Sequence, residues 1–204
     1  MSASRDRRET TGPGLLRAGA ASLEAKSVSK DRVLVESAVL VPIYRDASGD
    51  WRIVMIRRAE GGLHGGQLAF PGGRRDPADA SALETALREA EEEIGLTRDR
   101  VRILEALPVF DTLSTAFRVA PFLALVTPPA SWRRNQREVA EVLEPRVADL
   151  AAPAARGEED YQLPGWAEPR RVRYLRVGSA RLWGVSYRIL EPVLPRLLGS
   201  EFDA

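Results

Sequence analysis

Hydrophobic residues occur in short runs that alternate with turn-forming residues from position 33 onwards. Val, Leu and Ile dominate residues 33–44 and recur in residues 51–56, while residues 46–50 between them (Asp-Ala-Ser-Gly-Asp) are turn formers. Aliphatic and β-branched runs bounded in this way are typical of strands, so the two runs predict a β-hairpin. The same pattern predicts further strands at residues 101–109, 117–126, 139–144 and 171–177.

Two segments have the spacing of amphipathic helices. In residues 80–94 the aliphatic side chains follow a period of about 100° per residue and share one arc, formed by Leu83, Leu87, Ala90 and Ile94. Residues 187–198 form the second segment, in which Pro192 predicts a kink or a late start. Strands mixed with two or three helices, without an internal repeat, predict an α+β or α/β sandwich on one core.

The first 30 residues differ from the rest of the chain. Residues 2–14 combine charged side chains with Gly and Pro and predict a loose segment, while residues 15–26 predict a short peripheral helix. Neither stretch carries recognisable chemistry. We therefore expect a flexible N-terminal segment at residues 1–30 and one domain at residues 31–200, a length that suits a single core.

The composition narrows the kinds of partner and site. Lys and Arg (30) balance Asp and Glu (29) to a formal net charge of +1, which gives no electrostatic support for binding nucleic acid or an anionic membrane. A small-molecule partner is favoured instead. Because the chain has no Cys, disulfides, thiolate zinc sites and cysteine nucleophiles are excluded, and we expect any metal to have oxygen ligands.

The start of the chain bears on its location in the cell. No apolar run approaches the roughly 20 residues of a membrane helix. The Ser and Arg residues near the start are similar to those of a transit peptide, but such peptides avoid acids, and this segment contains Asp6, Glu9 and Glu24. We therefore expect a cytoplasmic protein outside the membrane. The sequence leaves the oligomeric state open, a homodimer included.

The second half of the helix at residues 80–94 has a charge pattern that is unfavourable on its own. Glu89, Glu92 and Glu93 cluster away from the aliphatic arc, near a C-terminus that Gly95 is suited to cap. The helix dipole disfavours anions there, and each like-charge pair costs roughly 0.2 to 0.5 kcal/mol. A hard divalent cation, Mg²⁺ or Mn²⁺, would resolve the conflict and bridge to substrate phosphates. The alternative is an acidic face that is simply solvated.

The sequence upstream of this helix favours the metal interpretation. Residues 70–73 (Phe-Pro-Gly-Gly) predict a strand end that runs into a Gly-rich turn, where the backbone can approach a ligand closely. Together with the helix they resemble the Nudix box, G-x5-E-x7-R-E-U-x-E-E-x-G-U, in which U is aliphatic. Gly73 matches its first position, and residues 88–96 match its end with a small residue at the first U. The middle departs from the pattern, because Asp79 replaces the first Glu and eight residues instead of seven separate it from Arg88.

This resemblance implies an α/β/α sandwich around a mixed β-sheet and makes residues 31–200 a Nudix hydrolase domain. It implies metal ligands at Glu89, Glu92 and Glu93, and it implies that Arg88 orients a helix carboxylate by ion pairing. The implied reaction is attack of a metal-activated water on one phosphorus of a diphosphate, without a covalent intermediate.

A carboxylate outside the box is expected to assist deprotonation of the water. Glu138 is the first candidate and Glu141 the second, because both follow a Pro- and Arg-rich loop. Their place is similar to the region where Nudix enzymes often carry such a base. The alternative is that both are exposed strand acids.

The segment upstream of the helix resembles the coenzyme A pyrophosphatase branch of the family. That branch reads H-x-G-Q-x-A-F-P-G-G-x-x-D-x-x-D before T-A-L-R-E-A, and the chain matches at residues 64–79 and 85–90. The branch also has an Arg between a Leu and the His and a Thr further upstream, whereas Leu63 directly precedes His64 and Ile56 takes the Thr position. The resemblance implies substrate contacts at His64, Gly66, Gln67, Gly72 and Gly73. For the lone histidine, a structural or surface role is the alternative.

The function implied by this branch is hydrolysis of coenzyme A or its thioesters to 3′,5′-ADP and a phosphopantetheine product. One alternative is another Nudix hydrolase, acting on ADP-ribose, a dinucleotide or a nucleoside triphosphate. A second is a non-catalytic Nudix domain that binds a nucleotide as a sensor. The intact Arg88, Glu89, Glu92 and Glu93 argue against a sensor, because a site that no longer catalyses has little reason to keep glutamates that repel one another.

Overall fold

The computed structural model describes residues 34–61, 64–112, 116–162, 167–199 and 201–202. They all belong to the second of two units of the chain, Arg32–Ala204. The N-terminal segment predicted at residues 1–30, with its short helix, lies outside the described residues, as does Leu63.

The central sheet is built around a long buried strand, β1, whose neighbour β8 runs parallel to it. The strand order is β2-β1-β8-β6, with β5 paired to β1 and β7 paired to β8. The bounds are β1 Val35–Arg45, β2 Trp51–Ile53, β5 Gly72–Arg74, β6 Val101–Ala106, β7 Phe110–Asp111 and β8 Phe117–Val126. The predicted hairpin is confirmed by the antiparallel pairing of β1 with β2, and the strand at residues 117–126 is confirmed in full. The strand predicted at 101–109 instead ends at Ala106, two residues before Pro108, which has no N–H to donate to a ladder.

Two smaller antiparallel sheets complete the strands. One has the order β4-β3-β9, formed by Leu68–Ala69, Met55–Arg58 and Val139–Leu143. The other has the order β10-β11-β12, formed by Arg156–Tyr161, Arg170–Val177 and Ala180–Trp183. The predicted strands at 139–144 and 171–177 correspond to β9 and β11, whereas β10 and β12 were not predicted.

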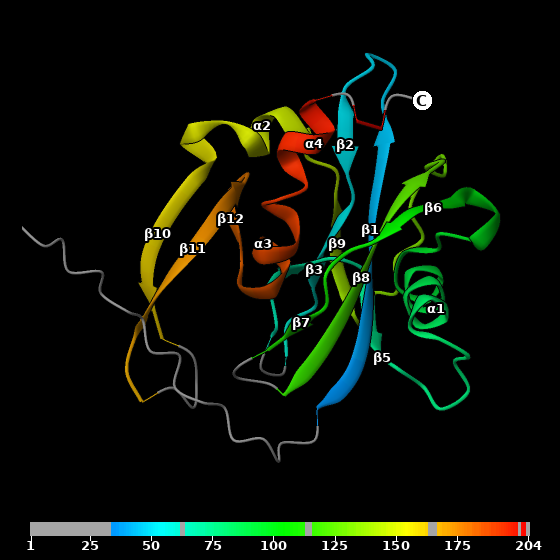
Figure 1. Ribbon diagram of the computed structural model, residues 1–204, viewed down its shortest axis with the longest axis horizontal. Coiled ribbons are helices and arrows are strands. Elements are labelled where there is room, and N and C mark those ends of the chain that lie inside the picture. The colour runs from blue at the N-terminus through cyan, green and yellow to red at the C-terminus, as the bar shows by residue number, and fades with distance from the viewer. Residues whose placement is uncertain (1–33, 62–63, 113–115, 163–166, 200, 203–204) are drawn as a thin grey trace, which may run out of the picture. The chain divides into compact units, whose positions relative to one another are not determined.

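The helices lie on both sides of the central sheet, as Figure 1 shows for α1 on one side and α3 and α4 on the other. Their bounds are α1 Ala82–Ile94, α2 Val147–Ala151, α3 Gly184–Leu190 and α4 Leu194–Leu198, with 3₁₀ turns at Arg98–Arg100 and Pro153–Ala155. The kink predicted at Pro192 is confirmed, because α3 and α4 are separate helices on either side of it. The helices and the mixed sheet form the predicted α/β/α sandwich.

The core is divided by the sheet into two hydrophobic clusters. Alternate residues of β1 point to opposite faces, so Ala38 and Leu40 pack towards α1 while Val41 and Ile43 pack towards α3 and α4. This two-sided burial explains why β1 is apolar almost throughout. No helix among the described residues is long and apolar enough to cross a membrane.

Candidate active site

The helix α1 is capped at both ends, by Ser81 and by the expected Gly95. The hydroxyl of Ser81 accepts a hydrogen bond from the Glu84 N–H at the N-terminus, and Gly95 closes the C-terminus in a left-handed conformation with φ 71°. Ala90 and Ile94 of the expected aliphatic arc are buried, Leu87 packs against the same core cluster, and Ala86 adds to it. Leu83, in the first turn of the helix, is only half-buried.

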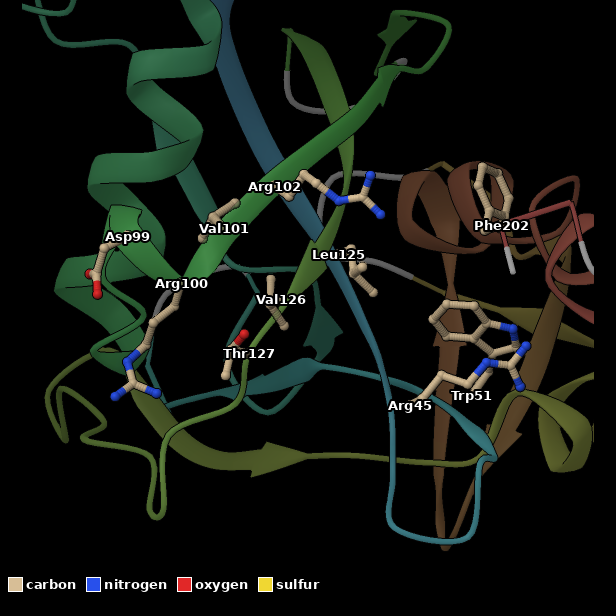
Figure 2. Close-up of a pocket in the computed structure, with 10 residues that line it drawn as sticks. All are labelled: Arg45, Trp51, Asp99, Arg100, Val101, Arg102, Leu125, Val126, Thr127 and Phe202. Carbon is tan, nitrogen blue, oxygen red and sulfur yellow. The ribbon is translucent and has the colours of Figure 1, made fainter. Parts of the chain in front are cut away.

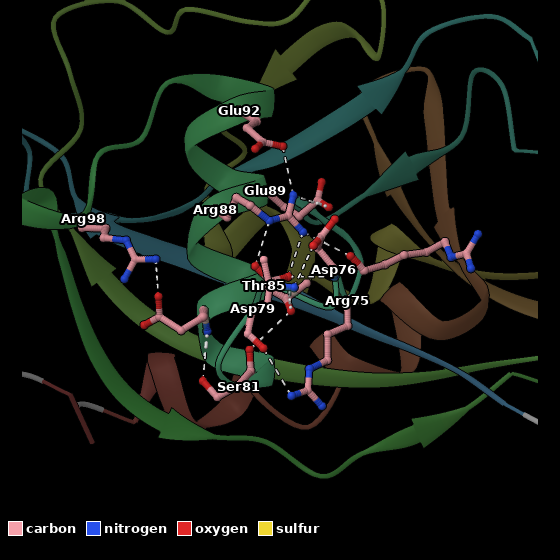
Figure 3. A network of polar contacts seen from close by, with 12 residues as sticks. Arg75, Asp76, Asp79, Ser81, Thr85, Arg88, Glu89, Glu92 and Arg98 are labelled. Atoms are coloured by element: carbon pink, nitrogen blue, oxygen red, sulfur yellow. Dashed lines mark hydrogen bonds and ion pairs between the residues drawn. The ribbon is translucent and has the colours of Figure 1, made fainter.

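Arg88 lies at the centre of a cluster of carboxylates (Figure 3). Its Nη1 is 3.0 Å from Glu89 Oε1 and 3.0 Å from Glu92 Oε2. On its other side, Nε and Nη2 donate to the two carboxylate oxygens of Asp79, each at 3.0 Å. The predicted ion pairing of Arg88 with helix carboxylates is therefore present, and Asp79 adds a bidentate anchor.

Asp79 is the residue that replaces the first Glu of the box, and it has a positioning role in this fold. Its side chain is 7% exposed and also accepts hydrogen bonds from the Thr85 hydroxyl and the Asp76 N–H. Hydrogen bonds from Arg88 hold the pKa of the Asp79 carboxyl well below its usual range. The loop before α1 is thus tied to the helix, and the Arg88 guanidinium is held in one orientation.

Replacing Asp79 with Asn is expected to lower the free energy of unfolding at pH 7 by about 2 kcal/mol, because charge-assisted hydrogen bonds to Arg88 are lost. Since folding depresses the pKa of Asp79, its stabilising contribution is present above the unfolded-state pKa of about 3.9 and is lost as the pH falls towards the folded-state value. Urea unfolding at pH 7 and pH 3 tests both statements. Asp111→Asn, which removes an exposed pair with Arg118, is the control and should change stability much less. A difference between Asp79→Asn and the parent that grows towards pH 3 would contradict the assignment.

Glu93 is buried against the Gly-rich turn. The residue is 2% exposed, and its Oε2 accepts a hydrogen bond from the Gly72 N–H at 2.9 Å. Burial raises the pKa of Glu93 to about 7, with the charges of Glu89 and Glu138 acting in the same direction and the Gly72 N–H and Arg58 opposing them. The three acids of α1 therefore do not share one solvated face, because Glu93 faces the turn and not water.

Glu89 is held against the next glycine of the same turn. A Cβ on Gly73 would lie 2.7 Å from Glu89 Oε2 and closer still to Oε1, so only glycine leaves room for the carboxylate there. Burial raises the pKa of Glu89, Arg88 lowers it, and the charges of Glu92 and Glu138 raise it. Glu92, in contrast, has a 55% exposed side chain that pairs with Arg88.

The loop before β9 brings Glu138 to this group. The backbone N–H groups of Arg133 and Asn135 donate to the Ile94 and Glu93 carbonyls, which satisfies two of the free acceptors at the end of α1. Glu138 lies three residues after Asn135 in this loop, and its charge raises the pKa of both Glu89 and Glu93. The second candidate, Glu141, lies further along β9 and pairs with Arg57 at 3.0 Å.

Arg58 is a site residue that the sequence analysis missed. It lowers the pKa of Glu93 by its charge, and the pairing of β3 with β9 shifts register between Arg57 and Arg58. Such an irregularity redirects the side chain that follows it. A pair of arginines at the end of a hydrophobic strand, just before the Gly-rich segment, was the signal available in the sequence.

The expected substrate loop packs beside β3. His64 Nδ1 lies 3.1 Å from Gln67 Oε1, so the histidine has a partner within the loop. The Gly66 N–H donates to the Arg58 carbonyl at 3.1 Å, and Gly66 has a left-handed φ of 72°. Arg58 thus joins the loop of His64 and Gln67 to the carboxylates of α1.

The donors at this site suit a hard divalent cation, although the described side chains do not by themselves form a group of three or more ready ligands. Glu89 and Glu93 lie on successive turns of α1. Glu93 packs against the Gly72 backbone and Glu89 against the Gly73 backbone. The charge of Glu89 raises the pKa of Glu93, and that of Glu138 raises the pKa of both. A cation such as Mg²⁺ or Mn²⁺ would relieve this repulsion, and carboxylate oxygens are the ligands it prefers.

Comparison with known proteins gives a match to a family and to several of its members. The model of the NUDIX domain family matches residues 35–173. A protein named Uncharacterized Nudix hydrolase NudL from Pectobacterium atrosepticum is 41% identical over 110 residues, which are 53% of this chain and 56% of that protein. A protein of the same name from Yersinia enterocolitica is 40% identical over 109 residues, which are 53% of this chain and 54% of that protein. The matched region therefore spans a little over half the length of these curated relatives.

Solved structures with the same architecture include a MutT/nudix family protein from Enterococcus faecalis. The alignment covers 85% of this chain and 66% of that chain with a TM-score of 0.56 and 14% identity. Another is the NUDIX domain of Shewanella oneidensis NrtR in complex with ADP ribose. That alignment covers 80% of this chain and 88% of that chain, with a TM-score of 0.52 and 14% identity. At these identities the similarity establishes the fold alone.

Proposed function

The chain belongs to the NUDIX domain family, and we propose that it hydrolyses the diphosphate linkage of a nucleotide derivative with the help of a divalent cation. The observation that carries the proposal is the packing of the Glu89 and Glu93 carboxylates against the backbone of Gly73 and Gly72. The charge of Glu138 raises the pKa of both carboxylates. When bound, Mg²⁺ or Mn²⁺ would activate the attacking water and offset charge on the departing phosphate.

The residues of the chain have separate tasks in this proposal. Glu89, Glu93 and, from the solvent side, Glu92 would hold the cation, and Arg88 keeps Glu89 and Glu92 in place through its anchor on Asp79. Arg58 supplies positive charge beside Glu93, where it can hold a phosphate oxygen. Glu138 is better placed than Glu141 to accept a proton from water, because Glu141 is engaged with Arg57.

Coenzyme A or one of its thioesters is the proposed substrate, which would be cleaved to 3′,5′-ADP and a phosphopantetheine product. The support is the motif at residues 64–79. Within it, the His64 ring contacts the side-chain oxygen of Gln67, so two of the motif residues lie together in the loop. A cytoplasmic location and a catalytic domain at residues 31–200 remain part of this proposal, and the oligomeric state, a homodimer included, stays open.

The second candidate is a domain that binds ADP-ribose, either to hydrolyse it or to sense it. The observation that favours it is the fold shared with the NrtR domain, which was solved with ADP ribose. The repulsion among Glu89, Glu93 and Glu138 argues for catalysis, because a site that only binds an anionic nucleotide gains nothing from three nearby carboxylates.

Removing the 3′-phosphate of coenzyme A is expected to lower kcat/KM by one to two orders of magnitude, because a charge-assisted contact is worth about 1.5 to 3 kcal/mol. The measurement compares coenzyme A, its 3′-dephospho form and ADP-ribose side by side with Mg²⁺ and with Mn²⁺, with products identified by mass spectrometry. More efficient cleavage of the dephospho form or of ADP-ribose would eliminate the coenzyme A assignment and leave a Nudix hydrolase of another substrate. Tight binding of ADP-ribose without turnover of any diphosphate would favour the sensor.

A further inference from the structure

A cavity lies at the opposite end of β1 from the candidate active site. It has a volume of about 860 Å³ and is lined by ends of β1, β2, β6 and β8 together with Phe202, as Figure 2 shows. Gly73 pairs with Ala38 near the start of β1, whereas Arg45 is its last residue, so about 23 Å of strand separates the two places. Because β1 and β8 are parallel, their carboxyl ends meet at this edge, which is a common position for ligands in sheets of this kind.

The charged side chains of the cavity favour an anion. Arg45, Arg100 and Arg102 line it, and Asp99 is the only acid among the described residues of the lining. The guanidinium of Arg100 donates to the Pro128 carbonyl at 3.4 Å, and this acceptor is uncharged. Within the part of the chain that the structure describes, Arg102 is exposed and its side chain has no ion pair. Guanidinium groups of this kind pair with phosphate in two places.

The aromatic side chains of the cavity suit a flat ring. Trp51 is 6% exposed, and the Arg45 guanidinium covers its indole at 4.2 Å from the ring centroid. The Trp51 Nε1–H is buried without a hydrogen-bond acceptor among the described residues, which is rare for an indole at that depth. In Figure 2 the side chain of Arg102 extends from β6 towards the side of Trp51 and Phe202, whereas the side chain of Arg100 points away from them. The cavity therefore suits a ligand that carries both an anionic group and a flat ring.

We propose that this cavity is a second binding site that takes a nucleoside monophosphate. Arg102 holds the phosphate, and the base packs against Phe202 and the edge of Trp51, where Arg45 can swing from the indole to the ligand. The site is independent of the proposed hydrolysis, since the length of β1 separates it from the Gly-rich turn that carries the carboxylates of α1.

The test follows AMP binding to the full chain without divalent cations, so that no turnover is needed. The ¹⁵N-labelled indole signals are titrated with AMP, and the Trp51 signal is assigned by its absence in Trp51→Phe. The Trp51 signal is expected to move, and AMP is expected to bind at least tenfold more tightly than inorganic phosphate or adenosine, because each supplies only half of the contacts. A Trp51 signal that stays in place at saturating AMP, or phosphate binding as tightly as AMP, would overturn the proposal.

Charge variants locate the phosphate. Arg102→Glu is expected to weaken AMP binding at least tenfold, and Arg102→Gln, which removes the charge without reversing it, should give a smaller loss. Arg188→Glu makes the same charge change on the exposed face of α3, where Arg188 lies over Phe110 and outside the cavity, and should bind AMP as the parent does. Equal weakening by Arg102→Glu and Arg188→Glu would mean a general effect of charge and would reject the site.

Discussion

Turnover of the diphosphate substrate is expected to fall at least a hundredfold in Glu89→Gln and in Glu93→Gln. Each substitution keeps the size of the side chain and removes one negative charge from the group that would hold the cation, so metal affinity and activation of water are both lost. The fold should persist, because the amide oxygen introduced by Glu93→Gln can still accept from the Gly72 N–H. Without metal, thermal stability should rise slightly, since a buried charge and its repulsion are removed.

The matched control for these variants is Glu91→Gln. Glu91 lies on the same helix and is exposed, so the same substitution of Glu by Gln is made there outside the site. It should keep the activity of the parent. Near-normal turnover of Glu89→Gln or Glu93→Gln at saturating Mg²⁺ or Mn²⁺ would remove that residue from the metal site. In the same assay, Glu138→Gln with an unchanged pH–rate profile would exclude Glu138 as the base.

The parts of the fold that were predicted correctly are those whose signal is local. β8 was predicted to the residue, because a mostly apolar run is bounded by turn-forming residues on both sides. The end of α1 at Ile94 was predicted from Gly95, which acts within one helical turn, whereas the helix begins at Ala82 and not at residue 80, because Ser81 caps it. β10 was missed because its sequence, Arg-Gly-Glu-Glu-Asp-Tyr, has the composition of a loop. It becomes a strand through β11, whose arginines face its acids in an ion-paired ladder.

The candidate site was predicted as a set of residues but not as an arrangement. The box identified Arg88 and the three glutamates, since their spacing along the chain is the pattern itself. Which glutamate is buried could not be predicted from the helix alone, because the burial of Glu93 comes from the Gly-rich turn that β5 lays across it. The pair Arg57-Arg58 marks the end of a strand in the sequence, but which of the two arginines reaches the site depends on the register shift of β3 against β9, which is a tertiary feature.

The two glycines of the turn give a second large effect, with each glycine as the control for the other. In Gly72→Ala the new Cβ would lie 2.7 Å from Val39 Cα and closer to the Ala38 carbonyl, at a φ of 154° that side chains rarely adopt. Backbone atoms cannot yield there, so β5 would separate from β1, and the free energy of unfolding should fall by about 3 kcal/mol.

In Gly73→Ala the new Cβ meets the carboxylate of Glu89, which is the far end of a flexible side chain. The fold can therefore accommodate the methyl group by moving that carboxylate by about 1 Å, and a displacement of this size at a reacting centre costs roughly a hundredfold in rate. We expect a thermal unfolding midpoint close to that of the parent, about a hundredfold lower turnover and weaker Mn²⁺ binding by calorimetry. Full activity in Gly73→Ala would show that the position of Glu89 against the turn has no part in catalysis. Unfolding of Gly73→Ala to the same extent as Gly72→Ala would instead assign both glycines to packing, because the loss of activity would then follow from the loss of the fold.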